Sequence, residues 1–270
     1  MLVHILKGEK VLPFLEKLSD FEKEFVYPSE DGVFELSHGK NYNQFFKTLR
    51  FNCDDPIFIL VVDELQTILG VVVAVLQSIP TALKCEKAWY ICDFKISKSV
   101  QNLSVIKLLL KTLKSVCHPI SDKTFALSMN TKGKNNKIVN FSMNNPFSAF
   151  KSAGVGQIYY LKNNHELTML KRMYPDSFLL QATDLKTIIM NGEKVDLWHF
   201  MPSKIGINNV FKDFKNVFML GEDCGNFSFE NRLVLANVNL IEDLSVFGSY
   251  SILQKGLDEM DWSYLTPFDI

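Results

Sequence analysis

The feature that most constrains this fold is a pair of apolar runs separated by a short polar turn. The first run, residues 57–62, reads IFILVV, and the second, residues 68–76, reads ILGVVVAVL. The turn between them begins at Asp63 and Glu64. Valine and isoleucine dominate both runs, and β-branched side chains favour strands over helices. We therefore predict an antiparallel hairpin here.

The segments after the hairpin alternate between strand and helix patterns. Residues 88–96 predict a strand, and alternation divides its side chains between two faces. One face would carry Ala88, Tyr90, Cys92, Phe94 and Ile96, and the other Trp89, Ile91, Asp93 and Lys95. The order from there is a helix at 105–116 ended by Pro119, a strand at 125–129, a helix near 138–153 capped by Gly154, and a strand at 155–161.

The strand–helix–strand order from 88 to 129 predicts a right-handed crossover. The strands near 88–96 and 123–130 should therefore run parallel. We expect them to diverge at the end that leads into residues 97–104.

Both ends of the chain give weaker patterns. Near the N-terminus we predict a strand at 3–6, an amphipathic helix at 11–26, a loop at 27–40 and a short helix at 42–49. In the last third we predict strands near 177–182, 218–220 and 233–238, a hairpin at 188–198 and a helix at 244–257. Asn191-Gly192 supplies the two positive φ values that a type I′ hairpin turn needs.

Composition narrows the class of protein. The 270 residues suffice for one large domain, or for a domain with an extension. With 29 basic against 30 acidic residues, general nucleic-acid binding is excluded. Five cysteines without a C-x-x-C pair indicate reduced thiols, and we predict no metal site. The uninterrupted apolar run at 68–76 is too short for a bilayer, and no signal peptide is recognisable. We expect a cytoplasmic protein without membrane contacts.

Residues 94–113 carry a family resemblance. In the GNAT superfamily of acyl-CoA-dependent N-acyltransferases, the fourth strand leads into a loop with the pattern Arg/Gln-x-x-Gly-x-Gly/Ala. Backbone N–H groups of that loop hold the CoA pyrophosphate at a helix N-terminus. Here Gln101 matches the first position, while Ser104 and Ile106 replace the two glycines. The element order over residues 3–161 also resembles this family.

The resemblance implies a fold and a set of sites. The fold is α/β (α+β): a mixed, mainly antiparallel sheet flanked by helices. Residues 1–163 would form the acyl-CoA-binding domain, and residues 164–270 a C-terminal α+β extension packed on it. The expected cofactor-binding residues are Phe94, Ile96, Gln101, Asn102, Leu103, Ser104, Val105, Ile106 and Asn145. The alternative interpretation of residues 101–106 is an ordinary polar turn that caps a helix.

Two further positions concern catalysis. Asp93 lies on the fourth strand, where many family members place a carboxylate that deprotonates the amine. Its alternative role is an ordinary ion pair with a lysine. The family's general acid is a tyrosine four residues before a Gly-Phe pair, but Phe150 stands there and has no proton to give. Lys132, Lys134 and Lys137 would reach a 3′-phosphate only if their loop is not simply solvated.

Three functions follow from these observations. The first is transfer of an acyl group from acetyl-CoA or another acyl-CoA to the amine of a small molecule or peptide. The second is a catalytically inactive protein of the same fold that binds a CoA derivative or a protein partner. The third places the activity in residues 165–270. In the first case the extension would supply the acceptor pocket or a homodimer contact.

Overall fold

The computed structural model describes residues 1–29, 32–38, 55–80, 85–100, 103–130, 136–144, 149–161, 164–173, 178–181, 187–195, 198–201, 217–219, 233–237, 244–260 and 262. Among these residues, no helix combines the length and the apolar character needed to cross a membrane. The helix expected at 42–49 lies outside the described residues.

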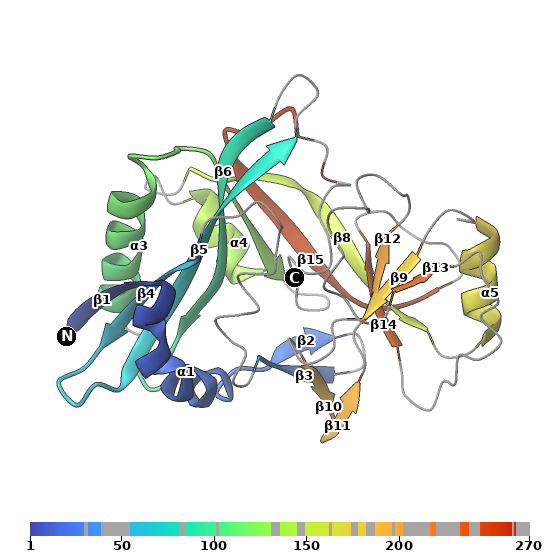
Figure 1. Ribbon diagram of the computed structural model, residues 1–270, viewed down its shortest axis with the longest axis horizontal. Coiled ribbons are helices and arrows are strands. Elements are labelled where there is room, and N and C mark those ends of the chain that lie inside the picture. The colour runs from blue at the N-terminus through green and yellow to red at the C-terminus, as the bar shows by residue number, and fades with distance from the viewer. Residues whose placement is uncertain are drawn as a thin grey trace.

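Eight strands form the main sheet, in the order β1-β4-β5-β6-β7-β15-β8-β14 (Figure 1). Their bounds are β1 Leu2–Lys7, β4 Ile57–Val62, β5 Ile68–Pro80, β6 Cys85–Ile96, β7 Thr124–Met129, β8 Lys151–Leu161, β14 Leu233–Asn237 and β15 Ser245–Lys255. Only the β6–β7 pair is parallel, and every other neighbouring pair in this sheet is antiparallel. The predicted mixed, mainly antiparallel sheet is confirmed.

Two smaller sheets accompany the main one. The first has the order β11-β10-β3-β2 and the second β12-β9-β13. Their strands are β2 Tyr27–Ser29, β3 Gly32–Ser37, β9 Phe178–Gln181, β10 Thr187–Met190, β11 Glu193–Val195, β12 Trp198–Met201 and β13 Val217–Met219. Met190 pairs with Glu193 across Asn191 and Gly192, which have φ values of 52° and 82°. The predicted Asn-Gly hairpin turn is confirmed.

Helices cover the two faces of the main sheet. On one face α3, Leu103–Cys117, buries Val105 and Leu109 against apolar residues of β4, β5 and β6. On the other, the 3-10 helix η1, Gly8–Phe14, and α1, Leu15–Glu22, bury Val11 and Leu18. These two short helices replace the single helix expected at 11–26. The other helices in the described part of the chain are α4, Lys137–Asn144, and α5, Asn164–Met173.

Three sequence predictions of secondary structure are wrong. The helix expected at 244–257 is instead the strand β15, Ser245–Lys255. This strand lies between β7 and β8 and is buried almost throughout, so it lacks the alternation of a half-exposed strand. The expected loop at 27–40 contains the β2–β3 hairpin, where Pro28 is tolerated because β2 is an edge strand. The helix expected at 138–153 ends at Asn144, and residues 151–153 begin β8.

The position of β15 bears on the organisation of the chain. β15 pairs with β7 on one side and with β8 on the other. Residues 2–161 contribute six strands to this sheet, and β14 and β15 of the last third complete it. The expected domain boundary near residue 163 stays a prediction.

Candidate functional site

The parallel strands β6 and β7 pair over three residues only. Trp89, Tyr90 and Ile91 align with Thr124, Phe125 and Ala126. Beyond this register β6 continues to Ile96 and β7 to Met129, and no further pairing between them is found among the described residues. The predicted parallel arrangement is confirmed, and the two strands cease to pair at the end that leads into residues 97–104.

A β-bulge interrupts β6 just after the pairing with β7 ends. In the β5–β6 register, Val73 faces Cys92 but Val71 faces Lys95. Two residues, Asp93 and Phe94, therefore lie opposite Val72. Asp93 adopts a φ of 54°, which is unusual for a residue other than glycine.

The bulge corrects the predicted faces of this strand. One inserted residue reverses the side to which every later residue points. Ala88, Tyr90 and Cys92 belong to the core on the α1 face. Phe94 and Ile96 instead pack with the core under α3, together with Trp89 and Ile91. Lys95 reaches Glu22 of α1. The assignment of Phe94 and Ile96 to the face of Tyr90 is therefore wrong.

Charged side chains gather on the α1 face beside the bulge. Lys95 Nζ lies 2.7 Å from Asp93 Oδ1 and 3.4 Å from Glu22 Oε1. The side chains of Lys95, Asp93 and Glu22 are only 5%, 9% and 1% exposed. Lys95 Nζ also lies 5.7 Å from the ring centroid of Phe25 and 5.9 Å from that of Tyr27. Asp93, the predicted proton acceptor, is thus part of a buried ion pair.

His38 extends this cluster from the end of β3. Its Nδ1 lies 2.5 Å from Glu22 Oε1, and its backbone N–H donates to Glu22 Oε2 at 2.8 Å. Burial alone would raise the pKa of Glu22, but His38 and Lys95 together lower it. Burial would lower the pKa of Lys95, but the neighbouring carboxylates, Asp93 first, hold it above its usual range. Both groups are therefore charged at neutral pH. Burial raises the pKa of Tyr27 to about 12, so its hydroxyl keeps its proton.

The turn after β6 is fixed by a buried serine. Ser97 N–H donates to Leu69 O at 2.9 Å, and the Ser97 hydroxyl donates to Glu24 Oε2 at 2.9 Å. Ser99 N–H in turn donates to Ser97 Oγ at 3.3 Å. This turn ties the end of β6 to β5 and to the chain just after α1.

The predicted pyrophosphate residues divide into two groups. Gln101 and Asn102 lie outside the described residues. Leu103, Ser104, Val105 and Ile106 form the first turn of α3. Val105 is fully buried and Ile106 is half-buried. The N-terminus of α3 thus lies just after the turn that follows β6, the strand with the bulge.

The polar contacts around α4 centre on a residue that sequence reasoning missed. Asn136 Oδ1 accepts hydrogen bonds from the N–H groups of Ile138 and Val139, at 3.0 and 3.2 Å. Its Nδ2 donates to Met129 O at 2.8 Å and to Ser128 Oγ at 3.0 Å. An asparagine just before an apolar stretch is an N-cap signal, which would have placed this helix start.

The other residues expected around α4 fall elsewhere. Asn145, Lys132 and Lys134 lie outside the described residues. Lys137 is the first residue of α4. Phe150 precedes β8 and is not on a helix, so its comparison with a helical tyrosine is wrong in structural context as well as in chemistry.

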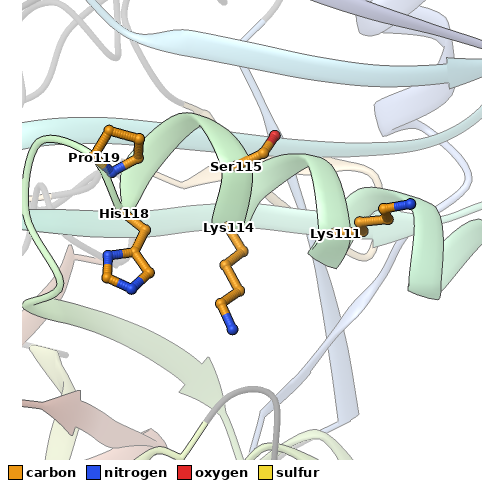
Figure 2. Close-up of a pocket in the computed structure, with 5 residues that line it drawn as sticks. All are labelled: Lys111, Lys114, Ser115, His118 and Pro119. Carbon is orange, nitrogen blue, oxygen red and sulfur yellow. The ribbon is translucent and has the colours of Figure 1, made fainter.

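A shallow hollow of about 410 Å³ lies at the far end of α3 from Leu103 (Figure 2). Its lining residues are Lys111, Lys114, Ser115, His118 and Pro119. Cationic side chains are favourable near a helix C-terminus, where they meet the negative end of the helix dipole. The helix dipole therefore explains why basic residues gather here, and no bound ligand is needed to explain them. Among the described residues, no group of three His, Cys, Asp or Glu side chains is placed to hold a metal ion.

Comparison with known proteins identifies the fold. No protein-family model matches the sequence, and no curated protein matches it. A tandem GNAT protein from the clavulanic acid biosynthesis pathway superposes with a TM-score of 0.55 at 5% identity, over 94% of this chain and 98% of that one. A GCN5-related glucosamine N-acetyltransferase region of a fungal multi-domain GH3 β-N-acetylglucosaminidase gives 0.50 at 8% identity, over 94% and 38%.

These likenesses, with the parallel β6–β7 pair in an otherwise antiparallel sheet, define the class: the chain has the GNAT fold. The resemblance predicted from residues 3–161 is confirmed at the level of fold.

Proposed function

We propose that the chain binds an acyl-CoA between the separated ends of β6 and β7 and transfers its acyl group to an amine. The observation that carries the proposal is the early end of the β6–β7 register, at Ile91 and Ala126, beside a bulge in β6. Backbone groups of β6 beyond Ile91 are not used by β7, so an extended amide-containing chain could pair with them.

Two groups of described residues among those expected to hold the CoA support this proposal. Phe94 and Ile96 direct their side chains into the core under α3, which leaves their backbone groups to pair with the pantetheine arm. Leu103, Ser104, Val105 and Ile106 present the N–H groups of a helix start to the pyrophosphate, with Gln101 and Asn102 just ahead of them. Asn145 would follow α4.

In the proposed reaction the neutral amine attacks the thioester carbonyl. A new C–N bond forms, the C–S bond breaks, and the CoA thiolate leaves. Asp93, at the bulge, accepts the proton that the amine loses, and that proton finally goes to the thiolate. A backbone N–H of β6 would polarise the carbonyl. Residues 164–270 would contribute an acceptor pocket or a homodimer contact, and the setting would be the cytoplasm.

Thermal unfolding with a panel of acyl-CoA thioesters and free CoA tests this function. A ligand that binds only the folded state stabilises it by about 2.7 kcal/mol at a hundredfold excess over Kd. We expect a concentration-dependent rise in Tm for the thioesters. No shift with any thioester at millimolar concentration would remove the proposal.

The first turn of α3 offers a sharper test through Ile106. A β-branched side chain restricts approach of phosphate to the backbone, so Ile106→Gly should tighten CoA binding, where each tenfold gain is about 1.4 kcal/mol. The same change should lower stability by roughly 1 kcal/mol because glycine is unfavourable in a helix. Calorimetric titration of both proteins measures the affinity. Unchanged or weaker CoA binding by the variant would favour the interpretation of residues 101–106 as a turn that caps a helix.

A second function is supported by one specific observation. Asp93 is ion-paired with Lys95 at 2.7 Å in a buried environment, and Phe150 offers no proton. A GNAT-fold protein that binds a CoA derivative or a protein partner without catalysis would need neither group. Tight CoA binding without amide formation from any amine would favour this function.

A further inference from the structure

The main sheet has an open edge at its first strand. β1 lies at one end of the sheet, and β4 is its only partner among the described strands. The backbone N–H and C=O groups on the other side of β1 are therefore outside any ladder of the described chain. Such groups can pair with a strand of another molecule. Figure 1 shows this edge at the opposite end of the molecule from α5.

β1 lacks the features that usually protect an edge strand. Its register with β4 runs from Leu2 to Lys7 without a bulge. The strand contains no proline, and its one lysine, Lys7, is its last residue. Proteins commonly block edge pairing with prolines, bulges or lysines within the strand. The edge of β1 is therefore available over most of its length.

Exposed apolar side chains line this edge on both faces of the sheet. Leu2 is 52% exposed and Ile5 is 51% exposed. Leu2 aligns with Val62, which belongs to the core on the α1 face. Ile5 aligns with Ile59, which belongs to the core under α3. A further strand beside β1 would extend both cores over these two side chains, because residues directly opposite each other in a sheet share a face.

The sequence of β1 is a chemical palindrome centred on His4. Residues 2–6 read LVHIL, with leucine at both ends and a β-branched residue on each side of the histidine. Two such strands can pair antiparallel about His4. Leu2 then faces Leu6 of the other strand, Val3 faces Ile5, and His4 faces His4. Each position meets a side chain of its own kind, and cross-strand pairs of this sort stabilise a sheet.

We propose that β1 pairs antiparallel with β1 of a second copy of this chain, about a two-fold axis at His4. The interface is isologous, because the same strand lies on both sides of the axis, so it closes at two copies. It joins the two main sheets into one, with eight strands from each copy. A second copy is the occupant that supplies the match at all five positions.

The place of β1 in the sheet separates this interface from the proposed acyl-CoA site. β4 and β5 lie between β1 and β6, so the pairing does not cover the separated ends of β6 and β7. A standard interface uses about 20–30 residues a side, so a contact centred on five paired positions predicts a weak dimer. We expect a dissociation constant in the micromolar range.

Sedimentation velocity over a concentration series tests the dimer. The unsubstituted chain of 30.9 kDa should convert to a species of twice that mass as its concentration rises. Ile5→Lys should weaken dimerisation at least about tenfold, because it places a charge opposite Val3 of the second copy. Met173→Lys is the matched control, since Met173 is a 45% exposed apolar residue of α5. This control should leave the dissociation constant unchanged, and circular dichroism checks that both variants are folded.

Cysteine cross-linking tests the register. Directly opposite residues of antiparallel strands have Cα atoms about 4.5–5.5 Å apart, which a disulfide can span. His4→Cys should therefore form a covalent dimer with oxidised glutathione. Ile5→Cys should not, because its two copies are offset along the strands by two residues, about 6.6 Å. A mixture of Ile5→Cys and Val3→Cys should cross-link, and the unsubstituted protein with its five cysteines gives the background.

The outcomes separate this pairing from other uses of the edge. A chain that stays monomeric at every concentration would overturn the proposal, and so would growth beyond the dimer, because two-fold pairing closes. Equal effects of Ile5→Lys and Met173→Lys would place the dimer contact elsewhere. Equal cross-linking of His4→Cys and Ile5→Cys would exclude the register centred on His4. A dimer that only Ile5→Lys weakens, and that cross-links through position 4, would support the pairing whether or not the chain binds CoA.

Discussion

The two faces of β6 carry different kinds of side chain beyond Cys92. Toward α3, Trp89, Ile91, Phe94 and Ile96 join the hydrophobic core beneath that helix. Toward α1, the apolar residues stop at Cys92, and Asp93 and Lys95 continue the strand with buried charges. The change occurs at the bulge, over a single inserted residue.

This difference distinguishes residues that stabilise the sheet from residues that form a buried polar cluster. Burying charges costs free energy unless they are paired, and replacing such a pair by apolar residues is often neutral or stabilising. The α1 face therefore has no stability reason to hold two carboxylates and an ammonium. Strained backbone and buried ion pairs together are typical of functional sites, and here both occur at Asp93.

The largest expected loss of stability comes from removing a charge on the α1 face of β6. Lys95→Met should destabilise the fold by roughly 3–5 kcal/mol, because it leaves the carboxylates of Asp93 and Glu22 buried without their shared ammonium. Urea denaturation measures the change. Lys151→Met, which removes the lysine of an exposed pair with Asp258, is the matched control and should change stability little. Equal effects would mean that Lys95 is not buried as described.

A smaller effect comes from Glu22. Glu22→Gln should cost about 1.5–3 kcal/mol at neutral pH, the usual loss for hydrogen bonds to a charged group. Because the folded-state pKa of Glu22 is lowered below its ordinary 4.5, its charge stabilises the protein above that pH, and this stability is lost as the pH falls through the folded pKa.

Denaturation series from pH 7 to pH 3 check the Glu22 prediction. The difference in stability between the unsubstituted protein and Glu22→Gln should shrink toward acid. Because His38, Lys95 and Asp93 face the same carboxylate, the difference between the two proteins is more informative than either curve. A gap that is constant or widens toward acid would contradict a lowered pKa.

The apolar face should respond to volume and not to charge. A Cβ added at Gly70 would lie 2.9 Å from Val105 Cγ1 and 3.0 Å from Leu109 Cδ1, so Gly70→Ala should cost about 1–3 kcal/mol by overpacking. In a Val105→Ala background the cost should fall, since that change provides the missing space. Denaturation of the four proteins of this cycle gives the coupling. Full additivity would contradict the close packing.

The smallest effect tests the direction of Ile96. Ile96→Val should cost roughly 0.5–1.5 kcal/mol, the usual loss for one buried methylene. It should leave the pH dependence of stability unchanged, because Ile96 packs under α3 and not beside the charged cluster. If Ile96→Val altered the acid part of the stability curve, the two faces would not be independent.

Sequence patterns predicted the regular parts of this molecule well. The hairpin at 57–76 and the helix that follows β6 have strong periodicity and clear turn residues, so local preferences and tertiary structure agree. The family resemblance then supplied the fold. The face of the sheet on which Phe94 and Ile96 lie could not be predicted, because strict alternation fails at a bulge. No residue type near Asp93 indicates that a bulge is present.

The charged cluster was equally hidden from the sequence. Glu22 and Lys95 are 73 residues apart, and only the fold brings them together. The sequence singled out Asp93 as a proton acceptor, with an ion pair to a lysine as the alternative role, and the structure pairs it with Lys95. Likewise, β15 lacks the alternating pattern of a half-exposed strand because both of its faces are buried. Asn136, in contrast, is a residue type that commonly starts a helix, and it caps α4.

The middle position of β15 sets an order for folding. Ser251 bonds to Asn130, 121 residues earlier in the chain, and Ile252 pairs with Leu127. As the chain leaves the ribosome, β7 and β8 must wait for β15 with their hydrogen-bonding edges open. Such open edges promote aggregation, and contacts so distant in sequence form slowly. We therefore expect nascent chains that stop before residue 245 to need chaperones, however stable the hairpin at 57–76 already is.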